Sequence, residues 1–401
     1  MATTVTVHKS YGSKLGDSFK GVLSGLLVFV AGFPLLFWNE GRAVKTARAI
    51  DEGEGACVSL ESNAKVDPEM EGKLVHLSGK ADTQDVLTDD EFGVSVTAIS
   101  LERKVEMYQW VEHEKKSEKK NVGGSSDITY TYTYTKEWVG SHISSGNFKE
   151  QGHDNPGAME FEGARKYAAN VSFGAYRLNE KQIAQIGSSQ QYTFPTNFVS
   201  RVERVKVQGA TIYVPNAETR SNALNNRDVL GQPRIGDMRV TFQVVYPHTI
   251  SLIAKQRGDS FVEYTAKNGK KLSYLTDGEE DAASMFATAR SNNKILTWIL
   301  RLVGFILMFS GLKAVFQPLA TLGEVLPFLG SLLNGGISIV AFLLAFPCAL
   351  ATIGIAWLIY RPIVGIVLLV AAVGAIIGLL KLKSSRAAVA PAPAPVEPPA
   401  Q

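Results

Sequence analysis

The chain has few cysteines and no excess of either charge, and both shortages exclude classes of protein. Its 401 residues include two cysteines, Cys57 and Cys348. Two thiols are too few for a disulfide framework or a cysteine-ligated metal site. The 41 Lys plus Arg nearly balance the 38 Asp plus Glu, so the composition gives no sign of the basic surface that nucleic-acid-binding proteins need. We therefore expect no nucleic-acid partner.

Motifs for catalysis are also missing from the sequence. The six histidines are scattered, and no HExxH, GxSxG or P-loop motif occurs. Residues 152–156 (GHDNP) are the most suggestive cluster, but their composition is typical of a turn. Residues 257–259 (RGD) also lie where a turn between two strands is expected. We predict no enzymatic activity and no catalytic, metal-binding or cofactor-binding residue.

Long apolar runs, by contrast, are abundant. Four of them approach or exceed the roughly 18 to 20 residues that a helix needs to cross a bilayer; they are residues 21–38, 295–312, 337–360 and 361–380. The sequence thus predicts an α+β membrane protein with one N-terminal and three C-terminal transmembrane helices. These helices would enclose a large strand-rich extracytoplasmic domain, residues 39–294.

Positive charge beside the spans predicts their orientation. A basic cluster, residues 381–386, follows the last span and places the C-terminus in the cytoplasm. Four crossings then put residues 1–20 in the cytoplasm and the domain in the periplasm or lumen. Residues 313–336, which contain two prolines, are predicted to form an amphipathic segment in the cytoplasmic interface. The Ala/Pro-rich residues 381–401 are predicted to be disordered.

Glycines in the spans predict where helices pack closely. Gly21, Gly25 and Gly32 fall on one side of the first span, and Gly374 and Gly378 on one side of the last. Such stripes let two helix backbones approach each other. The alternative is that glycine is simply common in transmembrane helices.

Arg301 lies about two turns inside the second predicted span. It either snorkels to the headgroups beside Lys294 and Trp298, or forms an ion pair with Glu40, which the predicted topology places at the same interface. Arg361, at the start of the last span, is a further candidate for charge pairing at a membrane interface.

Within the domain, alternating polar and apolar residues predict strands. Residues 128–135 (ITYTYTYT) would place their tyrosines on one face, opposite Tyr108 and Trp110. Residues 115–126 are predicted to be the loop of this hairpin. The remaining predicted strands lie within residues 72–79, 94–114, 200–214, 237–246, 249–255 and 261–275, and the predicted helices are residues 179–187 and 279–290.

Several short stretches keep their order along the chain and together resemble the LUMA family, transmembrane protein 43 in its animal form. These stretches are residues 39–43, 45–46, 71–76, 105–112, 147–148, 152–153, 155–156, 236–240, 254–259, 290–292 and 360–362. The motif positions that they supply in the domain are His76, Trp110, His153, Asn155, Pro156, Asp237, Arg257 and Asp259.

The resemblance implies four spans, a large luminal domain and no known enzymatic activity. Animal members are associated with the endoplasmic reticulum and the inner nuclear membrane, where they self-associate and contact nuclear-envelope proteins. The N-terminus, residues 115–126, residues 179–226 and the Ala/Pro tail depart from the family. We interpret these departures as prokaryotic, with the domain in the periplasm and the spans in a bacterial inner membrane.

These features lead to one main hypothesis and two alternatives. The main hypothesis is a non-enzymatic scaffold that binds the bilayer, itself and other membrane or envelope proteins. The first alternative is an enzyme or ligand-binding receptor with a site near His153, Asp154, Tyr130 and Tyr132. The second is an oligomeric channel with a polar path past the charged residues at the membrane interface.

Overall fold

The chain folds into two compact units, each assembled from separated segments. A computed structural model describes residues 2–221, 231–325, 327–363, 365–367 and 370. The sheet unit contains the described residues of Met1–Gly16, Thr46–Asn293 and Thr321–Ser331. The helical unit contains Asp17–Lys45, Lys294–Ala320 and the described residues from Leu332 onward.

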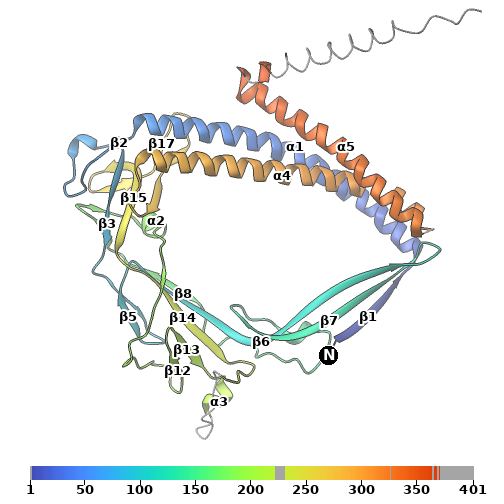
Figure 1. Ribbon diagram of the computed structural model, residues 1–401, viewed down its shortest axis with the longest axis horizontal. Helices are drawn as coiled ribbons and strands as arrows, with labels where there is room; N and C mark the ends of the chain where they lie inside the picture. The colour runs from blue at the N-terminus through green and yellow to red at the C-terminus, as the bar shows by residue number, and fades with distance from the viewer. Residues whose placement is uncertain (1, 222–230, 326, 364, 368–369, 371–401) are drawn as a thin grey trace, which may run out of the picture. The chain divides into compact units, whose positions relative to one another are not determined.

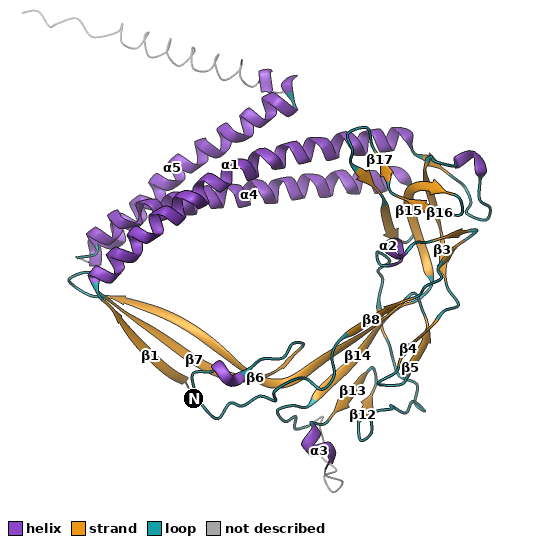
Figure 2. Ribbon diagram, turned by 180° about the vertical axis from the view of Figure 1, so that it is seen from behind, coloured by secondary structure: helices purple, strands orange, loops and turns teal. Residues whose placement is uncertain are grey.

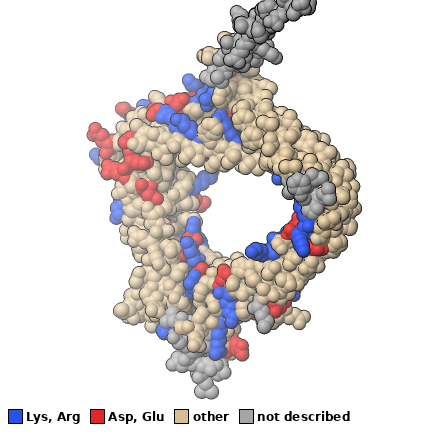
Figure 3. All heavy atoms as spheres, turned by 45° about the vertical axis from the view of Figure 1, so that its right-hand side comes forward, with Lys and Arg blue, Asp and Glu red and all other residues tan. Residues whose placement is uncertain are grey.

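Three long helices carry the candidate membrane spans: α1 (Tyr11–Ala56), α4 (Ala282–Gly323) and α5 (Pro327–Tyr360). Both ribbon views show α1 and α4 side by side (Figures 1 and 2). Many of their large apolar side chains are exposed, among them Leu27, Ile299 and Leu343, and Figure 3 shows a long stretch of tan surface over the helices. Such a surface suits lipid rather than water.

The larger sheet of the sheet unit contains the longest strands (Figure 1). Its main path runs, from edge to edge, through β1 (Ala2–Lys9), β7 (Ser126–Val139), β6 (Ser100–Lys120), β14 (Met238–Val245), β13 (Thr211–Val214) and β12 (Lys206–Gln208). β8 (Ala164–Tyr167) also pairs with β6, and β11 (Gln190–Gln191) with β14.

The second sheet follows the order β19 (Tyr274–Asp277), β15 (His248–Arg257), β16 (Ser260–Val262), β10 (Tyr176–Arg177), β9 (Ser172–Phe173), β3 (Leu74–Asp82) and β2 (Val58–Ser59), and β15 also pairs with β3. Two small pairs are β4 (Val86–Asp89) with β5 (Val94–Thr97) and β17 (Tyr264–Thr265) with β18 (Lys271–Leu272). The short helices are α2 (Glu180–Ile183), α3 (Ala217–Ser221) and the 3-10 turns η1 (Pro68–Met70) and η2 (Ser145–Asn147).

Aromatic side chains fill the two main cores of the sheet unit. In the first, the Tyr176 and Phe261 rings stack with centroids 4.8 Å apart. In the second, Phe92 and Phe242 are fully buried, with ring centroids 6.2 Å apart. Burying large rings in this way supplies much of the free energy that holds the strands together.

The predicted helix at residues 179–187 is present but shorter. Asn179 caps α2, and Gln182 completes the capping box in both directions. The helix at residues 279–290 begins later than expected, because its cap is Asp281, whose carboxylate accepts from Ser284 N at 2.8 Å. Asp277 belongs to β19 instead.

The β6–β7 hairpin is longer than its sequence predicts. Residues 115–120, expected in the loop, continue β6 and pair with β7, so the turn is confined to residues 121–125. The predicted partners are also wrong, because Tyr108 lies opposite Trp138 and Trp110 lies opposite Lys136. Lysines and glutamates are tolerated in these strands because most of their side chains here reach solvent.

The N-terminal segment is part of the sheet unit, and the boundary predicted between residues 1–20 and the domain is wrong. β1 pairs with β7 along its whole length, from Ala2 opposite Thr133 to Lys9 opposite Ser126. Strands that exchange hydrogen bonds in register form one folded body. β1 therefore belongs to the sheet unit, and the side of the membrane on which it lies stays a prediction.

The predicted interfacial segment, residues 313–336, is not a separate element. α4 continues through Pro318 to Gly323, and α5 begins at Pro327, the position in a helix where proline costs least. The described residues contain three candidate spans. The expected fourth span, residues 361–380, lies largely outside the described residues, as do Gly374 and Gly378.

Glu324, between α4 and α5, ties three segments of the sheet unit together. Its side chain is 5% exposed and forms ion pairs with Lys14 and Lys120. Next to it, Gly123 N donates to Val325 O at 2.9 Å. Burial raises the pKa of Glu324, but hydrogen bonds from Lys120 and Lys14 outweigh it and hold the pKa below its ordinary value of 4.5.

We expect Glu324→Gln to lower the free energy of unfolding by about 3 kcal/mol, because it leaves two lysines beside a buried neutral amide. Glu118→Gln is the matched control: its carboxylate is 38% exposed and lies 3.5 Å from Lys14 Nζ, so its effect should stay below about 1 kcal/mol. Unfolding in detergent measures both.

A lowered carboxyl pKa stabilises the fold above the unfolded value of about 4.5, and this contribution disappears as pH falls through the folded pKa. The difference between the native chain and Glu324→Gln should therefore shrink on acidification. At a pH low enough to protonate Glu324 in both the folded and the unfolded chain, a difference in unfolding free energy that has not shrunk would contradict the proposed ion pairing of Glu324.

Candidate functional site

A polar cluster in the helical unit joins the three described spans through one carboxylate. Glu40, on α1, is 1% exposed. Its Oε1 accepts from Arg301 Nε of α4 at 2.6 Å, and its Oε2 accepts from Arg301 Nη2 at 2.9 Å. Trp357 Nε1 of α5 donates to Oε2 at 2.7 Å. One side chain is thus bonded to both neighbouring helices.

Aromatic rings complete the surroundings of Arg301. Its guanidinium lies 4.7 Å from the centroid of the Trp298 ring and 5.6 Å from that of Trp357, which favours a cation in a dry environment. The ion pair with Glu40 is therefore the arrangement present, rather than snorkelling alone. Arg361 is exposed and is not among the described partners of Glu40.

Sequence reasoning missed Trp357, because only the packing of α5 brings its indole to Glu40.

Two of the stretches that resemble the LUMA family, residues 39–43 and 360–362, are in contact beside Glu40. Asn39 is fully buried and donates through Nδ2 to Thr297 O at 3.0 Å. A Cβ on Gly41 would lie 2.6 Å from the Tyr360 ring. Residues 39–43 and 360–362 therefore meet at one point of the helical unit, where a methyl group at position 41 would require the Tyr360 ring to shift.

The predicted glycine stripe is only partly in contact with another helix. A Cβ on Gly25 would lie 2.7 Å from Ala314 Cβ, and one on Gly32 would lie 2.5 Å from Met308 Cγ. A Cβ on Gly311, which sequence reasoning did not single out, would lie 2.6 Å from Gly25 O. Gly21, by contrast, has no atom that its Cβ would meet within 4 Å.

In the sheet unit, His153 is part of an aromatic cluster. Its ring stacks on Tyr134, with centroids 4.0 Å apart, and meets Trp110 edge-on at 4.5 Å. Burial and a hydrogen bond to Glu112 raise the pKa of Tyr134. Tyr130 stacks on Tyr132 instead, at 6.5 Å. The contacts of His153 therefore differ from those proposed for a receptor or enzyme site.

Asn155 and Pro156 hold a loop against the hairpin. Asn155 Oδ1 accepts from Trp110 N at 2.7 Å, while its Nδ2 donates to Trp110 O at 2.9 Å and Ile143 O at 3.1 Å. The amide thus acts like an extra strand residue beside β6. Pro156 O accepts a hydrogen bond from His142 Nε2 at 2.6 Å.

The remaining motif residues also make backbone or turn contacts. Asp237 is fully buried, and its carboxylate accepts from Asn216 N at 2.9 Å and Arg234 N at 2.7 Å. His76 Nε2 lies 2.8 Å from Glu280 O. Arg257 and Asp259 flank Gly258, whose φ of +59° makes the turn between β15 and β16. The RGD tripeptide is a turn, as predicted.

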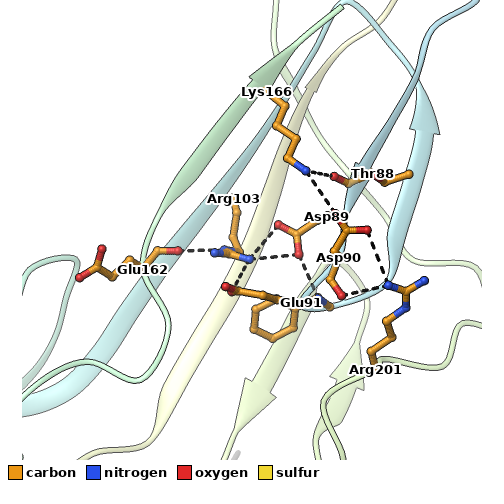
Figure 4. A network of polar contacts seen from close by, with 9 residues as sticks. Thr88, Asp89, Asp90, Glu91, Arg103, Glu162, Lys166 and Arg201 are labelled. Atoms are coloured by element: carbon orange, nitrogen blue, oxygen red, sulfur yellow. Dashed lines mark hydrogen bonds and ion pairs between the residues drawn. The ribbon is translucent and has the colours of Figure 1, made fainter.

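An acidic turn between β4 and β5 is held by a buried arginine (Figure 4). Arg103 is 7% exposed; its Nη1 donates to Asp89 Oδ2 at 2.8 Å and lies 2.6 Å from Glu91 Oε2. Asp89 Oδ1 also accepts from Phe92 N at 3.0 Å. Sequence reasoning missed this network. Its charges are paired with one another, so neither the buried guanidinium of Arg103 nor the carboxylate of Asp89 is left uncompensated.

One pocket of the sheet unit, of about 580 Å³, is lined by residues 82–85, 169–172 and 177–178. Its Asp85 carboxylate already accepts from Ala169 N at 2.7 Å and Asn170 N at 2.8 Å. The hydrogen bonds from Asn170 and, to a smaller extent, from Ala169 lower the pKa of Asp85. The described residues contain no cluster of three or more potential metal ligands.

We expect Gly311→Ala to destabilise the helical unit by about 1–3 kcal/mol, because the new methyl would collide with the backbone of α1 at Gly25 and Phe29. Gly21→Ala is the matched control and should cost less than about 0.5 kcal/mol, since its methyl meets open space. Unfolding in mixed micelles compares the two. Equal effects would contradict the close contact between α1 and α4.

Comparison with known proteins identifies the family. The profile of the family described as Transmembrane protein 43 matches residues 107–362. Transmembrane protein 43 of Mus musculus and of Homo sapiens are each 34% identical to this chain over 361 residues, covering 87% of both chains. The Transmembrane protein 43 homolog of Drosophila melanogaster is 30% identical over 364 residues, covering 87% of this chain and 91% of the homolog.

No solved structure matches the chain significantly. The three candidate spans and these relatives make the protein a multi-pass integral membrane protein. The chain belongs to the transmembrane protein 43 family.

Proposed function

We propose that this protein is a non-enzymatic membrane scaffold, which assembles with copies of itself and with other membrane or envelope proteins through its sheet unit. The N-terminus and the Ala/Pro tail depart from the family, and our interpretation of these departures as prokaryotic favours a bacterial inner membrane as the location of the protein. In this proposal the spans anchor the protein in the bilayer, and the sheet unit provides the surface on which assembly occurs.

The observation that carries the proposal is how the motif residues are used. The side-chain amide of Asn155 forms hydrogen bonds with the backbone of Trp110 and Ile143, and the carboxylate of Asp237 accepts hydrogen bonds from two backbone amides. Each of these groups maintains the shape of a loop or strand. Side chains that fix the backbone in this way give the sheet unit a defined surface, and a scaffold needs such a surface to bind its partners.

The anchoring also supports a structural role. α1 has 46 residues and α4 has 42, and each continues without a break from its apolar span into the sheet unit. Glu40 bonds α1 to both α4 and α5. Because an ion pair buried between helices is costly to break, the three spans act as one anchor and not as independent helices.

The experiment that tests the proposal is the protein mass of the full chain in lipid nanodiscs, measured by light scattering with the lipid contribution subtracted. We expect a discrete homo-oligomer whose mass does not change on about ten-fold dilution. A monomer at every concentration would contradict self-assembly, and a mass that falls continuously on dilution would show non-specific association instead.

A further inference from the structure

β1 is an edge strand whose outer side carries no other strand among the described residues. It pairs with β7 alone and ends the main path of the larger sheet. Six of its eight residues are exposed, and Val5 and Val7 are 42% and 48% exposed. Soluble proteins usually shorten, charge or cover such an edge, whereas this one is long and rich in threonine and valine.

We propose that β1 pairs with β1 of a second copy of this chain, in antiparallel orientation about a two-fold axis, and so joins the two sheets into one. This inference rests on the proposed self-assembly and names the surface that carries it. The outer N–H and C=O groups of each strand would then bond to those of its partner, as in other cases of strand addition.

The charges of β1 fit a second copy in this orientation. The strand carries its only ionisable side chains, His8 and Lys9, at one end, and Asp127 Oδ1 already lies 2.7 Å from His8 Nδ1. Antiparallel pairing puts these two residues of one copy beside neutral residues near Ala2 of the other. Parallel pairing in register would set Lys9 against Lys9, which is unfavourable.

The two-fold axis also fixes the residues that face each other. An axis perpendicular to the sheet keeps the same face of both copies on the same side, so each residue meets a residue of its own face. The centre of the pairing is therefore a residue opposite itself. The middle of the strand offers Val5 or Thr6, and either places β-branched side chains, which suit cross-strand pairs, against each other.

The interface between the two copies is tested by disulfide cross-linking of the full chain in nanodiscs. The native thiols are first removed by Cys57→Ser and Cys348→Ser, and Val5→Cys and Thr6→Cys are introduced separately. The residue on the axis has its Cβ about 4.5–5.5 Å from its copy, close to disulfide geometry. One of the two variants should form a disulfide dimer with at least about ten-fold higher yield than the control.

Thr133→Cys is the matched control, because Thr133 is exposed on β7 and at least three strand spacings, or about 14 Å, separate it from its copy in the proposed dimer. Two results would overturn the β1 interface and leave self-assembly standing. In the first, the control cross-links as efficiently as the β1 variants; in the second, the chain is oligomeric but neither β1 variant cross-links. A monomeric chain would overturn both.

A charge exchange gives an independent readout. Lys and Glu variants at whichever of Val5 and Thr6 lies on the axis should each lose the β1 pairing, and a mixture of the two should restore it, since opposite charges then face each other. The measurement is energy transfer between dyes on differently labelled copies. We expect transfer in the mixture to be at least about three-fold above that within either variant alone. Equal transfer in all three samples would contradict the proposal.

Discussion

The helical unit depends on one buried carboxylate. Glu40 is nearly inaccessible to solvent and accepts hydrogen bonds from Arg301 and Trp357. An unpaired carboxylate in such surroundings would cost several kcal/mol, so the position of α1 relative to α4 and α5 is set by the need to satisfy it. The glycines of α1 and α4 allow the close approach that brings these groups within reach.

In the sheet unit, the polar groups that need partners include the backbone N–H and C=O groups at the edges of strands. Its long hairpin exposes strand edges, and Asn155 covers part of β6 with an amide that imitates a strand. The carboxylates of the acidic turn after β4 are instead paired with the Arg103 side chain. The outer edge of β1 is a long strand edge that no other strand covers among the described residues, and for that reason we infer that another copy supplies the cover.

The sequence predicts those features that depend on local composition. The first three spans follow from hydropathy because lipid exposure is a property of each residue, and the turn at Gly258 follows from its local chemistry. The capping of α2 by Asn179 and Gln182 is equally local. The pairing of Glu40 with Arg301 could be proposed because two charges near a membrane interface have few other partners.

The features that sequence reasoning missed depend on contacts between distant segments. β1 pairs with residues more than a hundred positions away, and its Thr/Val alternation alone does not indicate a partner. The extension of β6 through residues 115–120 runs against the loop-like composition of that stretch. Trp357 gives no signal in sequence that its indole meets Glu40, since only the packing of α5 brings them together.

If the Glu40–Arg301 pair joins the spans, the two side chains should be energetically coupled, which a double-mutant cycle measures. The free energy of unfolding in bilayers would be measured for Glu40→Gln, Arg301→Gln and the double variant. We expect strong coupling, with the double variant losing about 2–3 kcal/mol less than the sum of the single losses. Losses that add to within about 0.5 kcal/mol would contradict it.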